Sequence, residues 1–177
     1  HCMTEAQLSN AMDAYGSTVY RLALTRMQNI ADAEDVYQEV FLRLWKQAAE
    51  DWDGDRAKAW LIRTTLNRCA DLHRFRLRRP VLSFAEIPDL AQPEDERREL
   101  WEAVSRLPEK ARTAVHLYYA EGYSAEEISQ LMHIPAATVR TRLHRARKQL
   151  KELLGGIDDE TCVSRSDGTN FGPQRAE

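Results

Sequence analysis

The strongest constraint on the fold is a helix-turn-helix pattern near the C-terminal end of the chain. Ser124, followed three residues later by Glu127, forms a capping box, in which each side chain satisfies a backbone amide at a helix start. His133 and Ile134 make the turn, and Pro135 fits the entry to a second helix because its fixed φ suits a first turn. In that second helix, apolar residues recur every three or four positions and predict a buried stripe: Val139, Leu143, Ala146 and Leu150.

The other face of this second helix is basic. Six Lys or Arg residues and no acidic residue lie between Arg140 and Lys151. Arg can bond guanine through two donors, Thr can reach a base edge or a thymine methyl, and further cations neutralise phosphates. Composition alone would favour an amphipathic helix with a solvated basic face, but the cap, the proline and the absence of acids favour DNA binding. The face in question comprises Arg140, Thr141, His144, Arg145, Arg147 and Lys148.

The formal net charge of -3 hides two neighbouring segments of opposite charge. Residues 32–55 hold eight acidic and two basic residues, whereas residues 56–79 hold eight basic residues and one acidic residue. An acidic surface repels DNA, so we expect the first segment to meet a basic protein and the second to meet phosphate. The charge pattern therefore predicts two surfaces with different partners.

Apolar periodicity predicts helices through the N-terminal half. Gly16 should break the first of them weakly, and Asn29 and Asp32 mark the start of the second. We expect three helices, at about residues 4–28, 32–49 and 56–76. Their expected buried residues include Val36, Val40, Leu44, Leu61 and Cys69.

The Pro-containing segment of residues 81–93 has no helical period, so it predicts a flexible linker. We expect four further helices, near residues 94–106, 109–121, 125–132 and 136–153, with Gly155-Gly156 capping the last. The expected fold is all-α, with two small helical domains joined by a flexible linker, the second a helix-turn-helix domain. The expected divisions are a first domain at 4–80, the linker at 81–93, a second domain at 94–154 and a disordered tail at 155–177.

Other features exclude several classes of protein. No apolar run approaches the roughly 20 residues of a membrane span, and the N-terminus lacks the apolar segment of a signal peptide. Cys2, Cys69 and Cys162 give no disulfide framework, which indicates a reducing, cytoplasmic setting. Cys69 and His73 form one i, i+4 pair, more often packing than a metal site, and Ser124 has no base partner. We therefore expect no membrane insertion, no enzyme activity, no cofactor and no bound metal.

Two segments of the N-terminal half resemble those of the extracytoplasmic-function (ECF) sigma factors, bacterial initiation factors reduced to two helical domains. The run of residues 32–45 resembles the segment of that family that binds RNA polymerase. The run Trp60-Leu61-Ile62-Arg63 is similar to the family's next helix, which handles the minus-ten promoter element, and it is followed by Asn67, Asp71 and Arg74.

A third segment, in the C-terminal half, resembles region four of the same family, which reads the minus-thirty-five element. It consists of Leu107-Pro108-Glu109-Lys110-Ala111-Arg112 and the helix-turn-helix. The resemblance covers about residues 8–153. Each motif alone is weak, because other regulators share the helix-turn-helix, but three motifs in the family's order are specific.

The resemblance implies where the chain would meet RNA polymerase. Family members bind the coiled coil of the polymerase β′ subunit through their acidic helix, and the polymerase β flap is a further implied partner. The alternative is an ordinary solvated helix face, with Phe41 and Trp45 in the core. The matching positions in this sequence are Asp35, Gln38, Glu39 and Leu42.

The resemblance also implies a site for the minus-ten element, at Trp60, Asn67, Asp71 and Arg74. Asn67 matches the pocket in which the family captures a base flipped from the non-template strand, and an amide can both donate to and accept from a base edge. Trp52 or Trp60 could offer a stacking face, although a core position for Trp60 is equally consistent with the sequence. The loop of residues 50–56 is more acidic than expected for a strand-binding loop.

On the second helix of the helix-turn-helix, the family's base-contacting positions are matched by Arg140, Thr141 and His144. The cations that flank them should contact phosphates: Arg142, Arg145 and Arg147. The implied function is to bind core RNA polymerase and direct promoter recognition, DNA melting and transcription initiation. Promoter DNA and an anti-sigma factor are the other implied partners. The alternative is a free-standing helix-turn-helix regulator, which would need an effector or receiver domain where the sequence predicts only helices.

Overall fold

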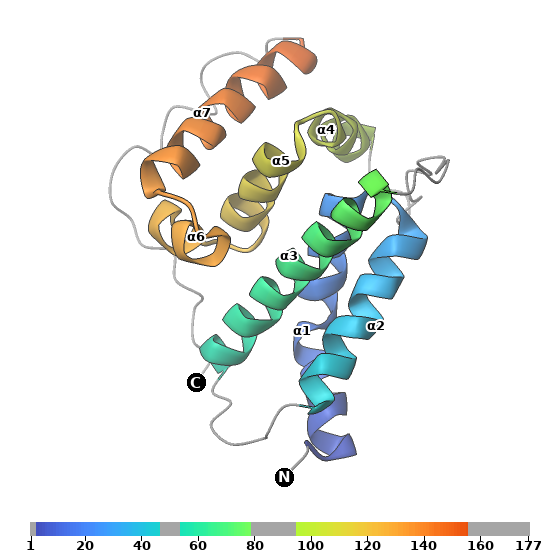
Figure 1. The fold of residues 1–177 in the computed structure, drawn as a ribbon. Coiled ribbons are helices and arrows are strands. Elements are labelled where there is room, and N and C mark those ends of the chain that lie inside the picture. Colours follow the sequence, from blue (N-terminus) through green and yellow to red (C-terminus); the bar gives the residue numbers. More distant parts are fainter. Residues whose placement is uncertain (1–2, 47–53, 79–94, 156–177) are drawn as a thin grey trace. The chain divides into compact units, whose positions relative to one another are not determined.

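The computed structural model describes residues 3–46, 54–78 and 95–155, and within these ranges its regular structure is entirely helical (Figure 1). The chain divides into two compact units, His1–Leu90 and Ala91–Glu177. The expected all-α fold with a separate helix-turn-helix domain is confirmed. The predicted linker, residues 50–53 of the acidic loop, with Trp52, and the predicted tail beyond Gly155 lie outside the described residues. Gly54 and Asp55, predicted to lie in that loop, are instead the first residues of a helix.

The first unit is a bundle of three helices, α1 (Glu5–Met27), α2 (Ile30–Lys46) and α3 (Gly54–Arg78), in which each helix packs against the other two. The middle helix, α2, runs antiparallel to its neighbours (Figure 1). Asn29 begins α2 as predicted, because its side-chain Oδ1 accepts a hydrogen bond of 3.0 Å from the Asp32 amide. The core includes the predicted Val36, Val40, Leu44, Leu61 and Cys69, all fully buried.

The weak break expected at Gly16 is wrong. Helix α1 runs without interruption through Gly16, which is buried. A Cβ atom at this position would lie 2.9 Å from the Tyr37 Oη atom. Glycine costs only about 1 kcal/mol relative to alanine inside a helix, and here its missing side chain lets α2 place Tyr37 against α1. Tertiary packing therefore outweighs the local preference.

The second unit contains α4 (Asp95–Ser105), α5 (Glu109–Val115), the π-helical turn η1 (His116–Ala120), α6 (Ala125–Met132) and α7 (Ala136–Leu153). Helix α7 packs against α5 and α6 and touches α4, so the other helices support it. Sequence periodicity predicts one helix over 109–121, and the structure adds that its last turn is a π-helix. The core of the unit includes Leu107, Leu117, Ile128, Val139 and Leu143.

The helix-turn-helix forms through the predicted caps. The Ser124 amide donates to Glu127 Oε2 (2.8 Å) and the Glu127 amide donates to Ser124 Oγ (3.2 Å). His133 ends α6 with a left-handed φ of 53°, and Pro135 is the N-cap of α7, one position before its first turn. Gly155, with φ of +74°, follows the end of α7. The residues at Ser124, His133 and Pro135 define where α6 begins and ends and where α7 begins.

Arg112 closes the corner between α4 and α5 from inside the unit. Its side chain is buried, and Nη1 donates to the backbone carbonyls of Ser105 (3.2 Å) and Leu107 (2.8 Å). A buried guanidinium needs such acceptors, because an unpaired charge in the interior is costly. The arginine of the region-four-like motif therefore has a structural position in this chain.

Candidate functional site

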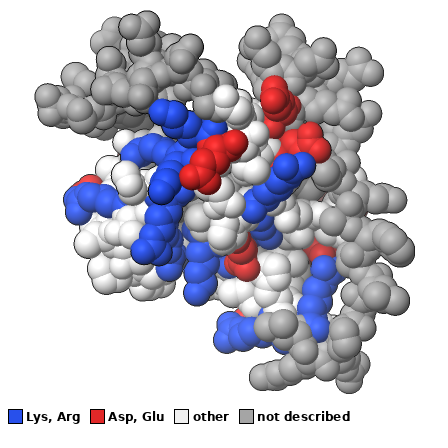
Figure 2. Space-filling model, turned by 90° about the horizontal axis from the view of Figure 1, so that it is seen from above, with Lys and Arg blue, Asp and Glu red and all other residues white. Residues whose placement is uncertain are grey.

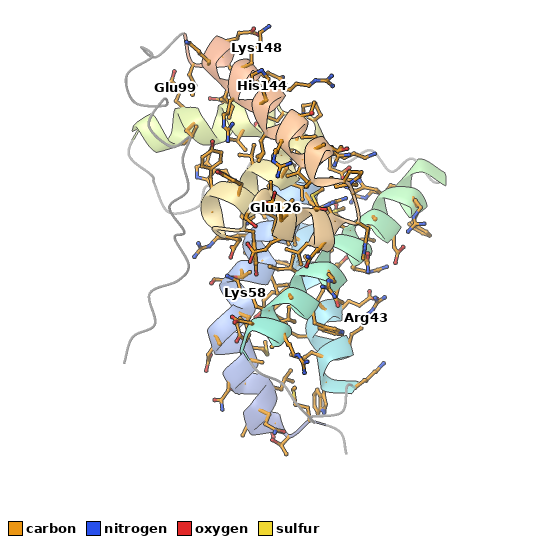
Figure 3. All side chains as sticks on the ribbon, turned by 90° about the vertical axis from the view of Figure 1, so that its left-hand side faces the viewer. Arg43, Lys58, Glu99, Glu126, His144 and Lys148 are labelled. Carbon is orange, nitrogen blue, oxygen red and sulfur yellow. The ribbon has the colours of Figure 1, made fainter. Side chains whose placement is uncertain are left out.

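The exposed face of α7 has the composition predicted for DNA binding. Val139, Leu143 and Ala146 are buried and Leu150 is half-buried, which leaves the polar side chains on the other side of the helix. His144 and Lys148 are labelled on this helix in Figure 3. The recognition face, as we call it, consists of the exposed Arg140, Thr141, His144, Arg145, Arg147 and Lys148. Arg142, predicted to flank this face, is half-buried.

Arg140 is held from the neighbouring helix. Its Nη2 atom donates to Oε1 of Glu126, which lies in the first turn of α6. Both side chains are 60% exposed, so the ion pair lies at the surface. Sequence spacing gives no sign of this pairing, because the two residues are 14 positions apart and only the turn brings them together.

Arg147 is held by two tyrosines of η1. Its Nε donates to Tyr119 Oη at 2.7 Å, and its guanidinium carbon lies 5.7 Å from the Tyr118 ring centroid and 5.9 Å from the Tyr119 centroid. A guanidinium over an aromatic face is attracted by the ring's electron density. Tyr119 remains 58% exposed, so the tyrosines present Arg147 at the surface and do not bury it.

On α3, the residues predicted to meet the minus-ten element differ in their surroundings. Asn67 is exposed, and Asp71 lies one turn further along the same side. Asp71 is paired with Arg74, whose Nη2 lies 2.7 Å from Asp71 Oδ1. Trp60 is half-buried and packs against the core of the first unit, which supports a core position for this side chain. The structure thus leaves Asn67, Asp71 and Arg74 together on the surface of α3.

The predicted polymerase-binding residues of α2 share one side of that helix, which we call the α2 face: Asp35, Gln38, Glu39 and Leu42. Asp35 and Gln38 are exposed, and Leu42 is 54% exposed. Trp45 is 45% exposed and continues the same side, whereas Phe41 is buried. The alternative with both aromatic residues in the core is therefore correct for Phe41 and wrong for Trp45.

Glu39 is the member of the α2 face that is already paired. Its Oε1 accepts a 2.8 Å hydrogen bond from Arg43 on the same helix, and its Oε2 lies 2.6 Å from Nε of Arg68 on α3 (Arg43 is labelled in Figure 3). Side-chain exposure is 34% for Glu39 and 25% for Arg68. The acidic helix and the basic helix are therefore joined by this carboxylate.

Asp32, at the start of α2, is a buried acid of the first unit. Burial raises the pKa of its carboxyl above the ordinary value, Asp35 raises it further, and the positive charges of Arg76 and His73 oppose the shift. Arg76, near the end of α3, donates to Oδ1, while Oδ2 is buried with no hydrogen-bond partner within the described structure. This ion pair fastens the last turns of α3 to the first turn of α2.

A metal-binding cluster and a membrane-spanning helix are both absent from the described ranges. No group of three or more His, Cys, Asp or Glu side chains gathers there in a way that could hold a metal ion. None of the described helices has the length and apolarity needed to cross a bilayer. Figure 2 shows Lys and Arg side chains over much of the described surface in that view, with Asp and Glu between them. The described surface thus presents charged side chains that can form ion pairs and hydrogen bonds (Figure 2).

Comparison with known proteins matches both halves of the chain. The family described as Sigma-70 region 2 matches residues 11–79, and the family described as Sigma-70, region 4 matches residues 97–150. The chain is 34% identical over 161 residues to the ECF RNA polymerase sigma factor SigE of Mycolicibacterium smegmatis, covering 85% of this chain and 62% of that protein. It is 30% identical over 155 residues to the ECF RNA polymerase sigma factor SigM of Bacillus subtilis, covering 82% of this chain and 94% of that protein.

The fold also matches a solved structure. The sigma factor RpoE from Bartonella quintana, crystallised with the anti-sigma factor NepR, aligns with a TM-score of 0.71 and 24% identity. The alignment covers 85% of this chain and 98% of the RpoE chain. At this identity the likeness concerns the fold. The chain thus spans about three fifths of the length of SigE but nearly all of SigM.

Proposed function

Because the chain belongs to the ECF sigma factors, a family of bacterial RNA polymerase initiation factors, we propose that it binds core RNA polymerase and directs promoter recognition, DNA melting and transcription initiation. The observation that carries the proposal is the pairing, in one chain, of a capped helix-turn-helix with a basic recognition face and an N-terminal bundle with an exposed α2 face. A DNA-reading surface and a protein-binding surface are what such a factor requires.

We assign the recognition face to the upstream, minus-thirty-five element. Helix α7 would enter the major groove with its N-terminal half, where Arg140, Thr141 and His144 meet base edges. Arg145 and the partly buried Arg142 would contact phosphates, as would Arg147 from its place on the tyrosines of η1. The base contacts are placed near the start of α7 because the recognition helix of such a motif meets bases there. Arg142 lies in the same stretch but is half-buried at the edge of the recognition face, so it is assigned to phosphate.

We assign the surface of α3 to the minus-ten element. Asn67 is exposed and carries the amide suited to an unstacked base, and the Asp71–Arg74 pair lies beside it. The half-buried Trp60 would support this surface from the core side, without serving as the principal stacking platform. The basic residues of α3 supply the general attraction to phosphate.

We assign the α2 face to the polymerase. Asp35, Gln38 and Leu42 offer charge, hydrogen bonding and apolar area side by side, and the exposed Trp45 extends the apolar part. A basic partner such as the β′ coiled coil would complement Asp35. The carboxylate of Glu39 contributes less free charge, because Arg43 and Arg68 already neutralise it.

The proposal includes three further points. The chain performs no chemistry of its own, since the polymerase forms the phosphodiester bonds. It acts in the cytoplasm, where the polymerase and promoter are found. An anti-sigma factor controls it, a suggestion supported by the family and by the RpoE fold, which was solved bound to one.

The proposal is tested by an electrophoretic mobility-shift assay on fragments of the source genome, with and without core RNA polymerase. We expect specific shifts only when both proteins are present, because a sigma factor gains specific promoter binding on joining the core enzyme. Core polymerase alone is the control for non-specific binding. Specific shifts by the chain alone, unchanged by core polymerase, would identify it as a free-standing regulator.

A further inference from the structure

Glu126 stands at the base-reading end of the helix-turn-helix. It lies in the first turn of α6, and its Oε1 accepts from Nη2 of Arg140 in the first half of α7 (Glu126 is labelled in Figure 3). The two helices pack against each other, and caps at Ser124, His133 and Pro135 fix how each begins or ends. The carboxylate is therefore presented to Arg140 by a rigid frame.

Among the cations of the recognition face, Arg140 is distinguished by this pairing. Within the described part of the chain, Arg142, Arg145 and Lys148 have no carboxylate within ion-pair distance, and Arg147 is held by neutral tyrosine rings. A carboxylate next to bound DNA opposes the attraction of phosphates, so Glu126 lowers general affinity for DNA. A gain in base specificity through Arg140 would offset this loss of general affinity.

The chemistry of arginine supplies that benefit. A guanidinium carries five donors in a rigid fork, so one side can bond a carboxylate while the other bonds two acceptors of a base. Guanine presents two such acceptors, O6 and N7, in the major groove. Holding the long side chain before DNA arrives reduces the conformational freedom that binding must remove. A fixed fork also fits one base-pair position better than its neighbours.

We propose that Glu126 is a specificity-determining residue that positions Arg140 to read one guanine of the upstream promoter element. The proposal rests on the proposed function of α7 as the reader of that element. Glu126 does not touch the base and acts through Arg140. The other role open to an acid in this place is a favourable interaction with the positive end of the α6 dipole, which would affect folding and leave base preference unchanged.

The experiment uses holoenzyme assembled from core RNA polymerase and the full chain. Sites are first selected from a double-stranded DNA library randomised at the upstream element, and affinity is then measured for the selected site, each single-base variant and a scrambled site. The variants are Glu126→Gln, Arg140→Ala and the double variant. Glu152→Gln is the matched control, because Glu152 is an exposed carboxylate on the same unit and its replacement changes charge by the same amount.

We expect Arg140→Ala to reduce preference at one base pair by about tenfold, and Glu126→Gln to reduce preference at that same base pair by about three- to tenfold. Glu126→Gln should leave binding to the scrambled site equal or tighter, because it removes a negative charge near phosphate. The double variant should match Arg140→Ala at that base pair, since Glu126 acts through Arg140. Glu152→Gln should leave base preference unchanged.

Three results would overturn the inference, in distinguishable ways. If Arg140→Ala relaxed one base pair while Glu126→Gln kept full preference, the positioning role of Glu126 would be wrong and the proposed function of α7 would stand. If neither variant changed base preference, the assignment of Arg140 as a reader would fail as well. Thermal unfolding of each variant is measured alongside binding. If Glu126→Gln lowered both stability and the preference at every base pair equally, Glu126 would have a structural role and the proposal would be wrong.

Discussion

Reversing the charge at Asp35 should weaken binding to core RNA polymerase without weakening the fold. Asp35 is exposed on the α2 face, so Lys can replace it with no loss of packing. A cation that faces a basic partner weakens the binding free energy by several kcal/mol at most. For one exposed position we expect a loss of about 2 kcal/mol in binding free energy, or roughly a 30-fold weaker Kd. The unfolding temperature should stay within about 1–2 °C of the parent protein, as surface changes rarely exceed about 0.5 kcal/mol.

Reversing Glu39 should behave differently, because of its partners. Its carboxylate is 2.8 Å from an Arg43 nitrogen and 2.6 Å from an Arg68 nitrogen, and a lysine would add a third cation there. Loss of two partly exposed ion pairs, each worth up to about 1 kcal/mol before solvent screening, plus new repulsion predicts about 1–2 kcal/mol lower stability. Glu39→Lys should therefore lower both the unfolding temperature and the affinity for polymerase.

The assay measures binding of fluorescently labelled chain to core RNA polymerase, alongside circular dichroism melts. Asp13→Lys, on the exposed side of α1, is the control for the same change in net charge. Asp35→Lys should lose affinity when Asp13→Lys does not. Equal affinity of Asp35→Lys and the parent protein for core polymerase would refute the assignment of the α2 face.

Three further outcomes follow from the contacts of single side chains. Arg140→Ala should weaken binding to the selected upstream element by about 1–3 kcal/mol and reduce the preference at one base pair. Arg147→Ala should weaken binding equally at all sequences and lower the slope of log affinity against log salt concentration by about one. Holoenzyme titrations at several salt concentrations check both, and the same behaviour of the two variants would contradict this division. Arg112→Ala should destabilise the second unit by about 2–4 kcal/mol, because the buried Leu107 carbonyl and the partly buried Ser105 carbonyl lose this donor, and urea unfolding checks it. Arg76→Ala should raise the pKa of Asp32 further, because Arg76 opposes the effect of burial. The folded variant then binds a proton at Asp32 more readily, so its loss of stability relative to the parent protein should shrink as pH falls through that pKa. A loss of stability that does not depend on pH would contradict this.

Local patterns predicted the helices and their caps well. The capping box at Ser124, the turn at His133 and the buried stripe of α7 depend on residues within a few positions of one another, so the sequence contains the whole signal. The resemblance of three ordered motifs led to the same family that the comparisons matched.

Contacts between distant residues were not predictable in this way. Gly16 suggests a weak helix unless Tyr37 is known to pack on it, and Trp45 shows no local sign of its exposure. Glu39 suggests a free charge until Arg68, 29 positions later, is placed beside it. The pairing of Glu126 with Arg140 has the same origin, since it depends on the angle between two helices and not on sequence spacing.

Transcription in vitro offers the decisive measurement. Core RNA polymerase and the full chain are incubated with a pool of genomic fragments and nucleotides, and the run-off transcripts are sequenced to locate their start sites. The account predicts transcripts that begin at defined positions, share upstream and minus-ten sequences, and require the added chain. Start sites that are the same with and without the chain would contradict its role as a promoter-selecting initiation factor.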